Sequence, residues 1–394
     1  MSFSDPECYP HLHQGNQRVC SSCFEDPDLR EFIRSANVYS ECDFCGARRA
    51  KTEALEEVVA LISGRVDQFF GRAVDQLPYE SAEGGYQDSN WDTYDLLTDY
   101  IGLELPRDRN DALLHAIADG LGDEAWCAYD WTQLEYDESL SFSWRQFSEI
   151  VMHRRRFFFH NIDDTGGGDP DSRSPFQLLD EIANLAKSYG CIKNVNAGSN
   201  YYRARPRMKG EHHETPEELG PPPERLALQA NRMNPPGIPM FYVADRKTLA
   251  LREINSQRCS LATFQSLKNI SVLDLCDLPP IPGFFSDASR RNTQLISFLH
   301  DFSRQISRPV PRDERVHVDY LPTQVFTEYL RDFEFDGSKI SGIRYPTSHP
   351  SRGSNFVFFT TQDGIEQDDY GDPFFFSPRD PLFRLTKVEQ RSAK

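Results

Sequence analysis

Residues 224–253 read ERLALQANRMNPPGIPMFYVADRKTLALRE, and this stretch guides the interpretation of the whole chain. Arg232 lies beside Asn and Pro-Pro-Gly residues, which predict a loop. Tyr242 lies in the apolar run IPMFYVA, which predicts a buried strand. Asp245 can cap a following helix that would carry Glu253. A loop cation, a strand aromatic and a helix carboxylate at one sheet edge would suit a ligand with phosphates and a flat ring.

The same residues have a simpler interpretation. A tyrosine in a strand is usually part of the core, and a glutamate on a helix usually lies on a solvated face. Considered one residue at a time, Tyr242 and Glu253 fit this interpretation better. The functional interpretation therefore depends on agreement with other stretches of the chain.

Composition limits the class of protein. A chain of 394 residues is long enough for two or three domains, and 38% hydrophobic residues with 28 Phe and 16 Tyr can form substantial cores. The formal net charge of −18 repels nucleic-acid backbones, so a general nucleic-acid binder is not expected. A small anionic ligand would need a locally basic pocket.

The sequence also indicates a cellular compartment. The residues after Met1 show neither the basic nor the apolar region of a secretory signal, and no run approaches the 18 apolar residues of a membrane span. We therefore expect a cytoplasmic protein without a membrane segment. Its nine cysteines are then better interpreted as thiols or metal ligands than as disulfides.

Four of these cysteines form a specific motif. Cys20-Ser-Ser-Cys23 is followed, after 18 residues, by Cys42-Asp-Phe-Cys45. Two such pairs supply four thiolates to one tetrahedral Zn²⁺, and a site with four sulfur ligands is usually structural because no position is left for water or substrate. A pair of redox dithiols is the alternative. We predict a structural zinc site with Cys20, Cys23, Cys42 and Cys45 as ligands.

The pattern along the chain predicts a multidomain protein. Residues 1–50 carry the zinc knuckle, and 51–162 show helical periodicity, which predicts an all-α domain. Gly- and Asp-rich residues at 163–173 predict a linker. Ser174-Pro175 then begins a helix, with Ser as the cap and Pro in the first turn, and opens an α+β domain over 174–394.

Arg154, Arg155 and His160 meet the loose Arg-x(4–6)-His pattern of HEPN-type ribonucleases. Basic residues near the end of a helix also complement its dipole, and this explanation needs no catalysis. A HEPN-like ribonuclease is therefore kept as an alternative function.

Two further stretches carry residues suited to chemistry. In YYRAR at 201–205, strand alternation places Arg203 and Arg205 on one face, where guanidinium groups match phosphate oxygens; an edge strand with charges in solvent is the alternative. Later in the chain, YLPTQ ends at Gln324, and GIRYPTS places Thr347 and Ser348 in a Pro-containing turn before a strand that starts near Asn355.

Taken together and in this order, these stretches resemble the RES family, and in particular its longer members with a HEPN-like helical domain ahead of the RES domain. For the N-terminal half the resemblance is one of architecture only. The matching residues are YRAR at 202–205, ELGPPP at 218–223, NRMNPPGIPMFY at 231–242, the Glu of LALRE, YLPTQ at 320–324, and GIRYPTS through GSNFVFF at 342–359.

The resemblance implies a fold similar to ADP-ribosyltransferases and an activity that degrades NAD⁺. It places Arg203, Arg232, Tyr242 and Glu253 at the matching site positions. The chain departs from the family at one point, because Thr347 occupies the position of the usual serine, with Ser348 next to it. The added methyl group makes this side chain stiffer than a serine.

The chemistry agrees with these residue types. The nicotinamide of NAD⁺ leaves as a neutral group, so a carboxylate such as Glu253 can stabilise the positive charge that develops on the ribose. Tyr242 would pack on the nicotinamide, and Arg203, Arg205 and Arg232 would bind the pyrophosphate. Thr347 or Ser348, Asn355 and Gln324 would contact the substrate from the opposite wall.

The sequence thus predicts a cytoplasmic enzyme that cleaves NAD⁺, as a glycohydrolase or phosphorylase, and acts as a toxin or in antiphage defence. Such an enzyme would suit control by an inhibitory or activating protein partner or by homo-oligomerisation. A non-catalytic module that senses a nucleotide is a further alternative.

Overall fold

The computed structural model describes residues 17–129, 134–158, 173–254, 256–308, 315–347, 353–366 and 380–392. The chain forms two compact units. The N-terminal unit comprises Met1–Leu134 and Ile281–Gln294, and the C-terminal unit comprises Glu135–Pro280 and Leu295–Lys394. The division after Leu134 differs from the expected domain boundary, and nearly all of the expected linker at 163–173 lies outside the described residues.

The N-terminal unit begins with the cysteine motif on a small sheet. Its strands are β1 (Arg18–Cys20), β3 (Ala50–Ala54) and β2 (Val38–Ser40), in that order, and both pairings are antiparallel. Helix α1 (Pro27–Ser35) is inserted between the two cysteine pairs. It starts where the Asp26 carboxylate accepts hydrogen bonds from two backbone N–H groups of the first turn.

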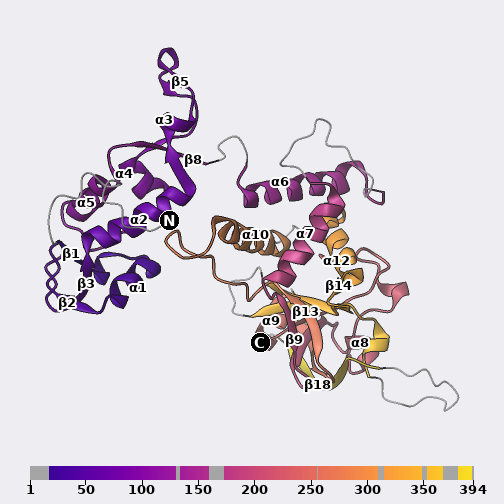
Figure 1. The fold of residues 1–394 in the computed structure, drawn as a ribbon. Helices are drawn as coiled ribbons and strands as arrows, with labels where there is room; N and C mark the ends of the chain where they lie inside the picture. Colours follow the sequence, from indigo (N-terminus) through magenta and orange to yellow (C-terminus); the bar gives the residue numbers. More distant parts are fainter. Residues whose placement is uncertain are drawn as a thin grey trace. The chain divides into compact units, whose positions relative to one another are not determined.

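The rest of this unit contains helices α2 (Leu55–Phe69), α3 (Ala73–Gln76), α4 (Thr93–Asp95) and α5 (Ala112–Leu121). A second sheet has the order β4 (Phe70–Arg72), β8 (Ala125–Ala128) and β7 (Trp91–Asp92). A hairpin of β5 (Tyr79–Glu80) and β6 (Gly85–Tyr86) extends from the unit (Figure 1). The prediction of an all-α domain was therefore wrong in detail, because residues 51–134 also contain short strands. The sequence did not reveal them, since strands of two to four residues are too short to show an alternating pattern.

A segment from the second half of the chain completes the N-terminal unit. Phe285 is 4% exposed in the core of this unit, and Phe284 packs beside it against Phe69. The Arg65 guanidinium pairs with the Asp287 carboxylate in the same unit. The core of the N-terminal unit therefore depends on residues 281–294, although these residues lie more than 140 positions beyond Leu134 in the sequence.

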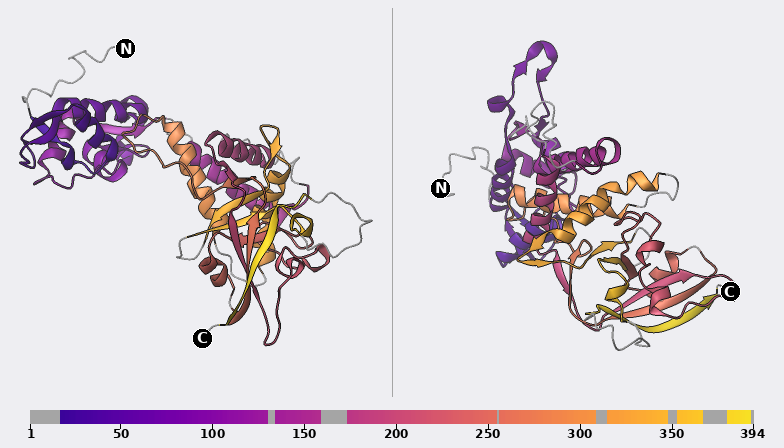
Figure 2. Two further views of the ribbon diagram at one scale, coloured as in Figure 1. Left: turned by 90° about the horizontal axis from the view of Figure 1, so that it is seen from below. Right: turned by 90° about the vertical axis from the view of Figure 1, so that its right-hand side faces the viewer.

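The C-terminal unit is built on a large mixed sheet. In the described part of the chain this sheet has eight strands, of which only β13 and β16 pair in parallel. Their spatial order is β18 (Phe383–Ser392), β12 (Arg258–Ser266), β10 (Asn200–Pro206), β11 (Phe241–Ala244), β17 (Ser354–Phe358), β16 (Gly342–Pro346), β13 (Ile270–Asp274) and β9 (Ile192–Val195). Figure 2 shows β18 as the long yellow strand at one edge.

Alternation along the strands gives the sheet two different faces. One face is lined by aromatic rings that meet edge to face, as in the pair Phe241 and Phe264, whose centroids are 4.9 Å apart, and Phe358 and Phe383 pack in the same cluster. The opposite face is covered by helices (Figure 1): α6 (Tyr136–Glu149), α7 (Pro175–Ser188), α10 (Arg290–Ser307) and α12 (Leu321–Asp332). This arrangement of helices on a mixed sheet agrees with the predicted α+β domain.

Helix α7 begins as predicted from Ser174-Pro175. The Ser174 hydroxyl accepts a hydrogen bond from the Gln177 backbone N–H, and the Gln177 side chain accepts one in return from the Ser174 N–H. Its apolar residues, including Leu178 and Ile182, are buried against the helical layer. No helix in the described ranges is long and apolar enough to cross a membrane.

Shorter helices connect the strands near the site. These are α8 (Pro216–Leu219), α9 (Lys247–Arg252) and α11 (Val316–Asp319), with a β14–β15 hairpin (Glu334–Phe335 and Ser338–Lys339) elsewhere in the unit. The expected Asp245 cap of α9 is not formed, because the Asp245 carboxylate accepts a hydrogen bond from the Ser354 backbone N–H at 2.9 Å. Asp245 therefore ties the start of α9 to the first residue of β17.

Candidate active site

The candidate site opens where two neighbouring strands separate. Strand β10 is in register with β12 over seven residue pairs but with β11 at only one, Tyr202 opposite Ala244. A cavity of about 710 Å³, which we call the first cavity, is lined by residues of both strands, including Arg203, Arg205 and Tyr242. The stretch 217–229 forms another part of its wall. Ala250 of α9 with Glu253 and Ile254 after it, the 231–240 loop, Tyr345 and Asn355 complete the lining.

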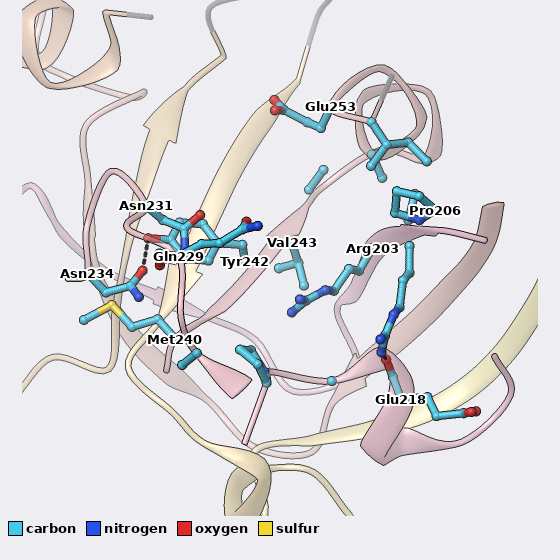
Figure 3. Close-up of a pocket in the computed structure, with 18 of the residues that line it drawn as sticks. Arg203, Pro206, Glu218, Gln229, Asn231, Asn234, Met240, Tyr242, Val243 and Glu253 are labelled. Atoms are coloured by element: carbon cyan, nitrogen blue, oxygen red, sulfur yellow. Dashed lines mark hydrogen bonds between the residues drawn. The ribbon is translucent and has the colours of Figure 1, made fainter. Parts of the chain in front are cut away.

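Arg203 lines the first cavity as the more buried of the two arginines on β10 (Figure 3). Its side chain is half-buried, and Nη1 is fully buried without a hydrogen-bond partner among the described residues. Its guanidinium lies 5.7 Å from the centroid of the Phe241 ring. Burial, with a smaller contribution from the charge of Arg205, lowers the pKa of Arg203 to about 10. An unpartnered buried cation of this kind is stabilised when an anion binds in the cavity.

Arg205 also lines the first cavity, as strand alternation predicts, but its environment differs. It is exposed, and its Nη1 donates a hydrogen bond to the backbone carbonyl of Glu218. The Glu218 carboxylate in turn accepts hydrogen bonds from the backbone N–H groups of Glu214 and Thr215, directly before α8. Arg205 therefore anchors the 217–223 stretch and has fewer free donors for a ligand than Arg203.

A second cavity, of about 670 Å³, adjoins the first. It is lined by residues of the 228–232 loop, by His317 and Tyr320 near α11, and by Pro346 at the end of β16. Some residues line both cavities, and we call them the shared wall: Gln229, Asn231, Tyr242, Glu253, Tyr345 and Asn355.

Glu253 belongs to this shared wall. We had predicted that Glu253 lies on α9. The structure ends α9 at Arg252, so Glu253 is the residue directly after the helix. Its Oε1 accepts a hydrogen bond from Asn355 Nδ2 at 2.9 Å. Glu253 is accessible to solvent, whereas Asn355 is 9% exposed, so a buried amide on β17 orients an accessible carboxylate. Figure 3 shows Glu253, Arg203 and Tyr242 around the same cavity.

Tyr242 is held by its hydroxyl group. The hydroxyl donates to Asn234 Oδ1 at 2.7 Å and accepts from the Met233 backbone N–H at 3.1 Å. Burial raises the pKa of Tyr242 well above its usual value, so the phenol stays neutral. With both hydrogen bonds made within the protein, Tyr242 offers the cavities its ring and not a proton donor.

Gln324 does not line either cavity, although we predicted that it binds substrate. It is 4% exposed on α12, and its Nε2 donates to the backbone carbonyls of Asn231 at 2.8 Å and Asn234 at 3.1 Å. Gln324 of the YLPTQ motif therefore holds the 231–234 loop in place, and this loop in turn positions Tyr242.

Arg232 and Arg203 lie in different cavities, although we expected both at one pyrophosphate. Arg232 lines the second cavity, and its Nη1 donates to the carbonyls of Ile306 and Arg308 at 2.5 Å each. These carbonyls lie at the end of α10, where backbone acceptors lack partners within the helix. The guanidinium also lies 5.6 Å from the centroid of the Tyr320 ring. Through Nη1, Arg232 therefore closes the C-terminus of α10.

The turn that carries the two predicted hydroxyl groups, Thr347 and Ser348, is described only in part. Pro346 lines the second cavity, and Thr347 follows it as a half-buried residue that is not among the residues lining either cavity. Ser348 lies outside the described residues. The roles of Thr347 and Ser348 remain predictions.

Sequence reasoning missed several residues of the cavities. Asn231 and Tyr345 lie within motifs we recognised, yet nothing in the sequence separated them from their neighbours. Arg225 and His317 had no signal at all, because each is a single polar residue whose position depends on the packing of distant segments. Asn234 gave an indirect signal through its place in the NPPG turn.

The four cysteines of the N-terminal unit lie together. Their Sγ atoms all fall within 4.8 Å of one another, with separations of 3.7 Å for Cys20 and Cys23, 3.5 Å for Cys20 and Cys45, and 3.7 Å for Cys23 and Cys42. A tetrahedron with Zn–S bonds of about 2.3 Å has edges of about 3.8 Å, so the cluster fits Zn²⁺. Gly46, with φ of +72°, allows the turn after the second pair.

The residues of the ribonuclease alternative are described only in part, and this alternative stays a prediction. Arg154 and Arg155 are exposed at the end of the helical segment that follows α6. His160 lies outside the described residues, so the expected pair is not seen as a site.

Comparisons with known proteins divide the chain in the same order as the sequence motifs. Residues 35–165 match the family described as HEPN/RES N-terminal domain 1. Residues 201–375 match the family described as RES domain. No curated protein and no solved structure matches the chain. The two family matches together cover most of the described residues.

Proposed function

Because this chain is a RES-domain protein of the longer type, with a HEPN/RES N-terminal domain ahead of the RES domain, we propose that it cleaves NAD⁺ and releases nicotinamide. RES domains are known for NAD⁺-related activity. The observation that supports this proposal most directly is that Glu253, Tyr242 and Arg203 line one cavity although they come from three different elements.

The first cavity would hold the pyrophosphate of the dinucleotide. Arg203 presents a buried donor without a hydrogen-bond partner in the described part of the chain, and phosphate oxygens are strong acceptors for guanidinium groups. A bound anion would also offset the burial that lowers the pKa of Arg203. The cavity volume of about 710 Å³ lies within the range of about 300–1,000 Å³ that is usual for small-molecule sites.

Cleavage itself needs little from the protein beyond charge stabilisation. The bond between ribose C1′ and the nicotinamide nitrogen breaks, and its electron pair neutralises the positive charge of the leaving group. Glu253 would stabilise the positive charge that appears on the ribose, and Asn355 orients its carboxylate through the 2.9 Å hydrogen bond. No general acid is required, which agrees with a Tyr242 hydroxyl that is engaged with Asn234.

The N-terminal unit would serve assembly or regulation. Its cysteine cluster has the separations of a zinc site, and we propose Cys20, Cys23, Cys42 and Cys45 as the ligands of a structural Zn²⁺. We further propose that the activity depletes cellular NAD⁺ as part of a toxin or defence system, since an enzyme that consumes this cofactor needs control by a partner, by assembly or by a trigger.

The direct test is to incubate the purified full chain with NAD⁺ and to measure nicotinamide by chromatography. We expect release by the wild type and a loss of at least about 100-fold in Glu253→Gln, because removing one electrostatic stabiliser typically has this effect. The matched control is Glu334→Gln, an exposed carboxylate on β14 that lines neither cavity.

Binding of ADP-ribose should be measured by calorimetry on the same proteins. Glu253→Gln is expected to bind ADP-ribose within a few-fold of the wild type, since Arg203 is unchanged. A wild type that binds ADP-ribose but leaves NAD⁺ intact would support a nucleotide sensor and overturn the enzymatic proposal.

A further inference from the structure

The second cavity reaches Glu253 from a different side than the first. If the pyrophosphate lies beside Arg203 in the first cavity, the ribose reaches the shared wall, and the second cavity gives a separate approach to it. We propose that the second cavity admits the acceptor of the ADP-ribosyl group, that this acceptor is water, and that His317 is its general base. This inference rests on the proposed function.

A buried group in the second cavity indicates a place for a small polar molecule. Ser307 is 8% exposed at the end of α10, and its Oγ is buried with no hydrogen-bond partner among the described residues. A buried hydroxyl without a partner is costly, and an ordered water commonly fills this role. The Ser307 hydroxyl therefore supplies an independent reason for a water in this cavity.

Water is favoured over an anionic acceptor because the arginines of the two cavities differ in their hydrogen-bond partners. In the first cavity, no described residue accepts a hydrogen bond from the buried Nη1 of Arg203, so this donor is available to an anion. In the second cavity, Arg232 donates to the carbonyls of Ile306 and Arg308. The carboxylate of Glu253 also lines this cavity and repels an oxyanion. A neutral acceptor meets neither obstacle.

His317 is the lining residue best suited to take the proton. The Tyr242 hydroxyl is engaged with Asn234, and burial raises the pKa of Tyr345, so that phenol keeps its proton. Arg232 is a donor only. His317 is exposed and makes no side-chain hydrogen bond or ion pair to a described residue. Its imidazole is the side chain most often used as a general base.

The step balances without another reagent. The C1′–N bond breaks as its electron pair moves to the nicotinamide nitrogen, which leaves neutral. The oxygen of water forms a new bond to C1′, and His317 removes one proton from that water and later passes it to solvent. The products are ADP-ribose, nicotinamide and one proton.

The partition between hydrolysis and base exchange tests this step. 3-Acetylpyridine can replace water as the acceptor, and it carries no proton that must be removed. We therefore measure ADP-ribose and the exchanged dinucleotide from one reaction mixture of NAD⁺ and 3-acetylpyridine, with wild type, His317→Ala and His212→Ala. His212 is an exposed histidine of the same unit that lines neither cavity.

We expect His317→Ala to shift the product ratio toward base exchange by at least about tenfold, since general base catalysis contributes about 100-fold or more. His212→Ala should keep the wild-type ratio. An unchanged ratio in His317→Ala, or an equal loss of both products, overturns the role of His317. Formation of ADP-ribose 1″-phosphate in phosphate buffer overturns water as the acceptor. A wild type that forms none of these products overturns the proposed function instead.

Discussion

Replacing Arg203 with methionine should make the free protein more stable and its nucleotide complex weaker. Arg203 Nη1 is buried with no hydrogen-bond partner among the described residues, and burial lowers the pKa of the guanidinium by more than two units, to about 10. Since one pKa unit corresponds to about 1.4 kcal/mol, the buried charge costs about 3 kcal/mol. This cost applies at any pH below about 10, where the folded protein still carries the proton. Stability should rise only above that pH.

The Arg203→Met variant does not recover all of this free energy, because it also loses favourable contacts of the arginine side chain. The cation over the Phe241 ring, 5.7 Å from its centroid, contributes about 0.5–1 kcal/mol, and the shorter side chain packs less surface. We expect Arg203→Met to raise the free energy of unfolding by about 1–2 kcal/mol. For a unit of this size, each kcal/mol raises Tm by about 2–4 °C.

The assay is thermal unfolding of the full chain with and without ADP-ribose, which has the pyrophosphate but is not cleaved. In the wild type ADP-ribose should raise Tm, and in Arg203→Met this rise should nearly vanish, since a hydrogen bond to a charged group contributes about 1.5–3 kcal/mol. Arg145→Met is the control, because Arg145 is exposed on α6 and lines neither cavity. A free Arg203→Met protein that is less stable than the wild type, yet binds ADP-ribose equally well, would refute the anion site.

Three other changes test the surrounding structure. We expect one zinc ion per wild-type chain by mass spectrometry, and Cys23→Ser should lose this ion and lower the Tm of the N-terminal unit. An N-terminal unit that unfolds cooperatively without bound zinc would contradict the structural site. Gln324→Ala should cost about 2 kcal/mol or more in denaturant unfolding, because two buried carbonyls lose their donor, and should lower kcat if the loop positions Tyr242. Tyr242→Phe should cost about 1–3 kcal/mol, as Asn234 Oδ1 and the Met233 N–H lose a partner, with the KM for NAD⁺ changed only a few-fold.

The site could be predicted from the sequence where residues act through their own type and local position. Arg203, Tyr242 and Glu253 lie on or beside predicted elements, and the structure brings them to one cavity. The four cysteines could be predicted because their spacing itself carries the geometry. These features depend on short stretches of chain and on residue chemistry.

Other parts depend on long-range packing and could not be predicted in this way. Gln324 had the residue type of a ligand contact, but its partners are backbone carbonyls 90 or more positions away. Arg232 had the charge of a phosphate contact, yet the end of α10 uses it. His317 lines a cavity only because α11 packs near the shared wall. No local pattern reports such partners.

The segment Ile281–Gln294 has a consequence for how the protein can be divided. The polypeptide leaves the C-terminal unit after Pro280, contributes Phe285 to the other core, and returns at Leu295. A fragment that starts at Glu135 would keep every cavity residue but leave Phe285 and Phe284 without their packing partners, as exposed aromatic surface prone to aggregation. The C-terminal unit therefore cannot be cut out as one continuous segment without residues 281–294 of the N-terminal unit, and fusions or truncations should keep both units together.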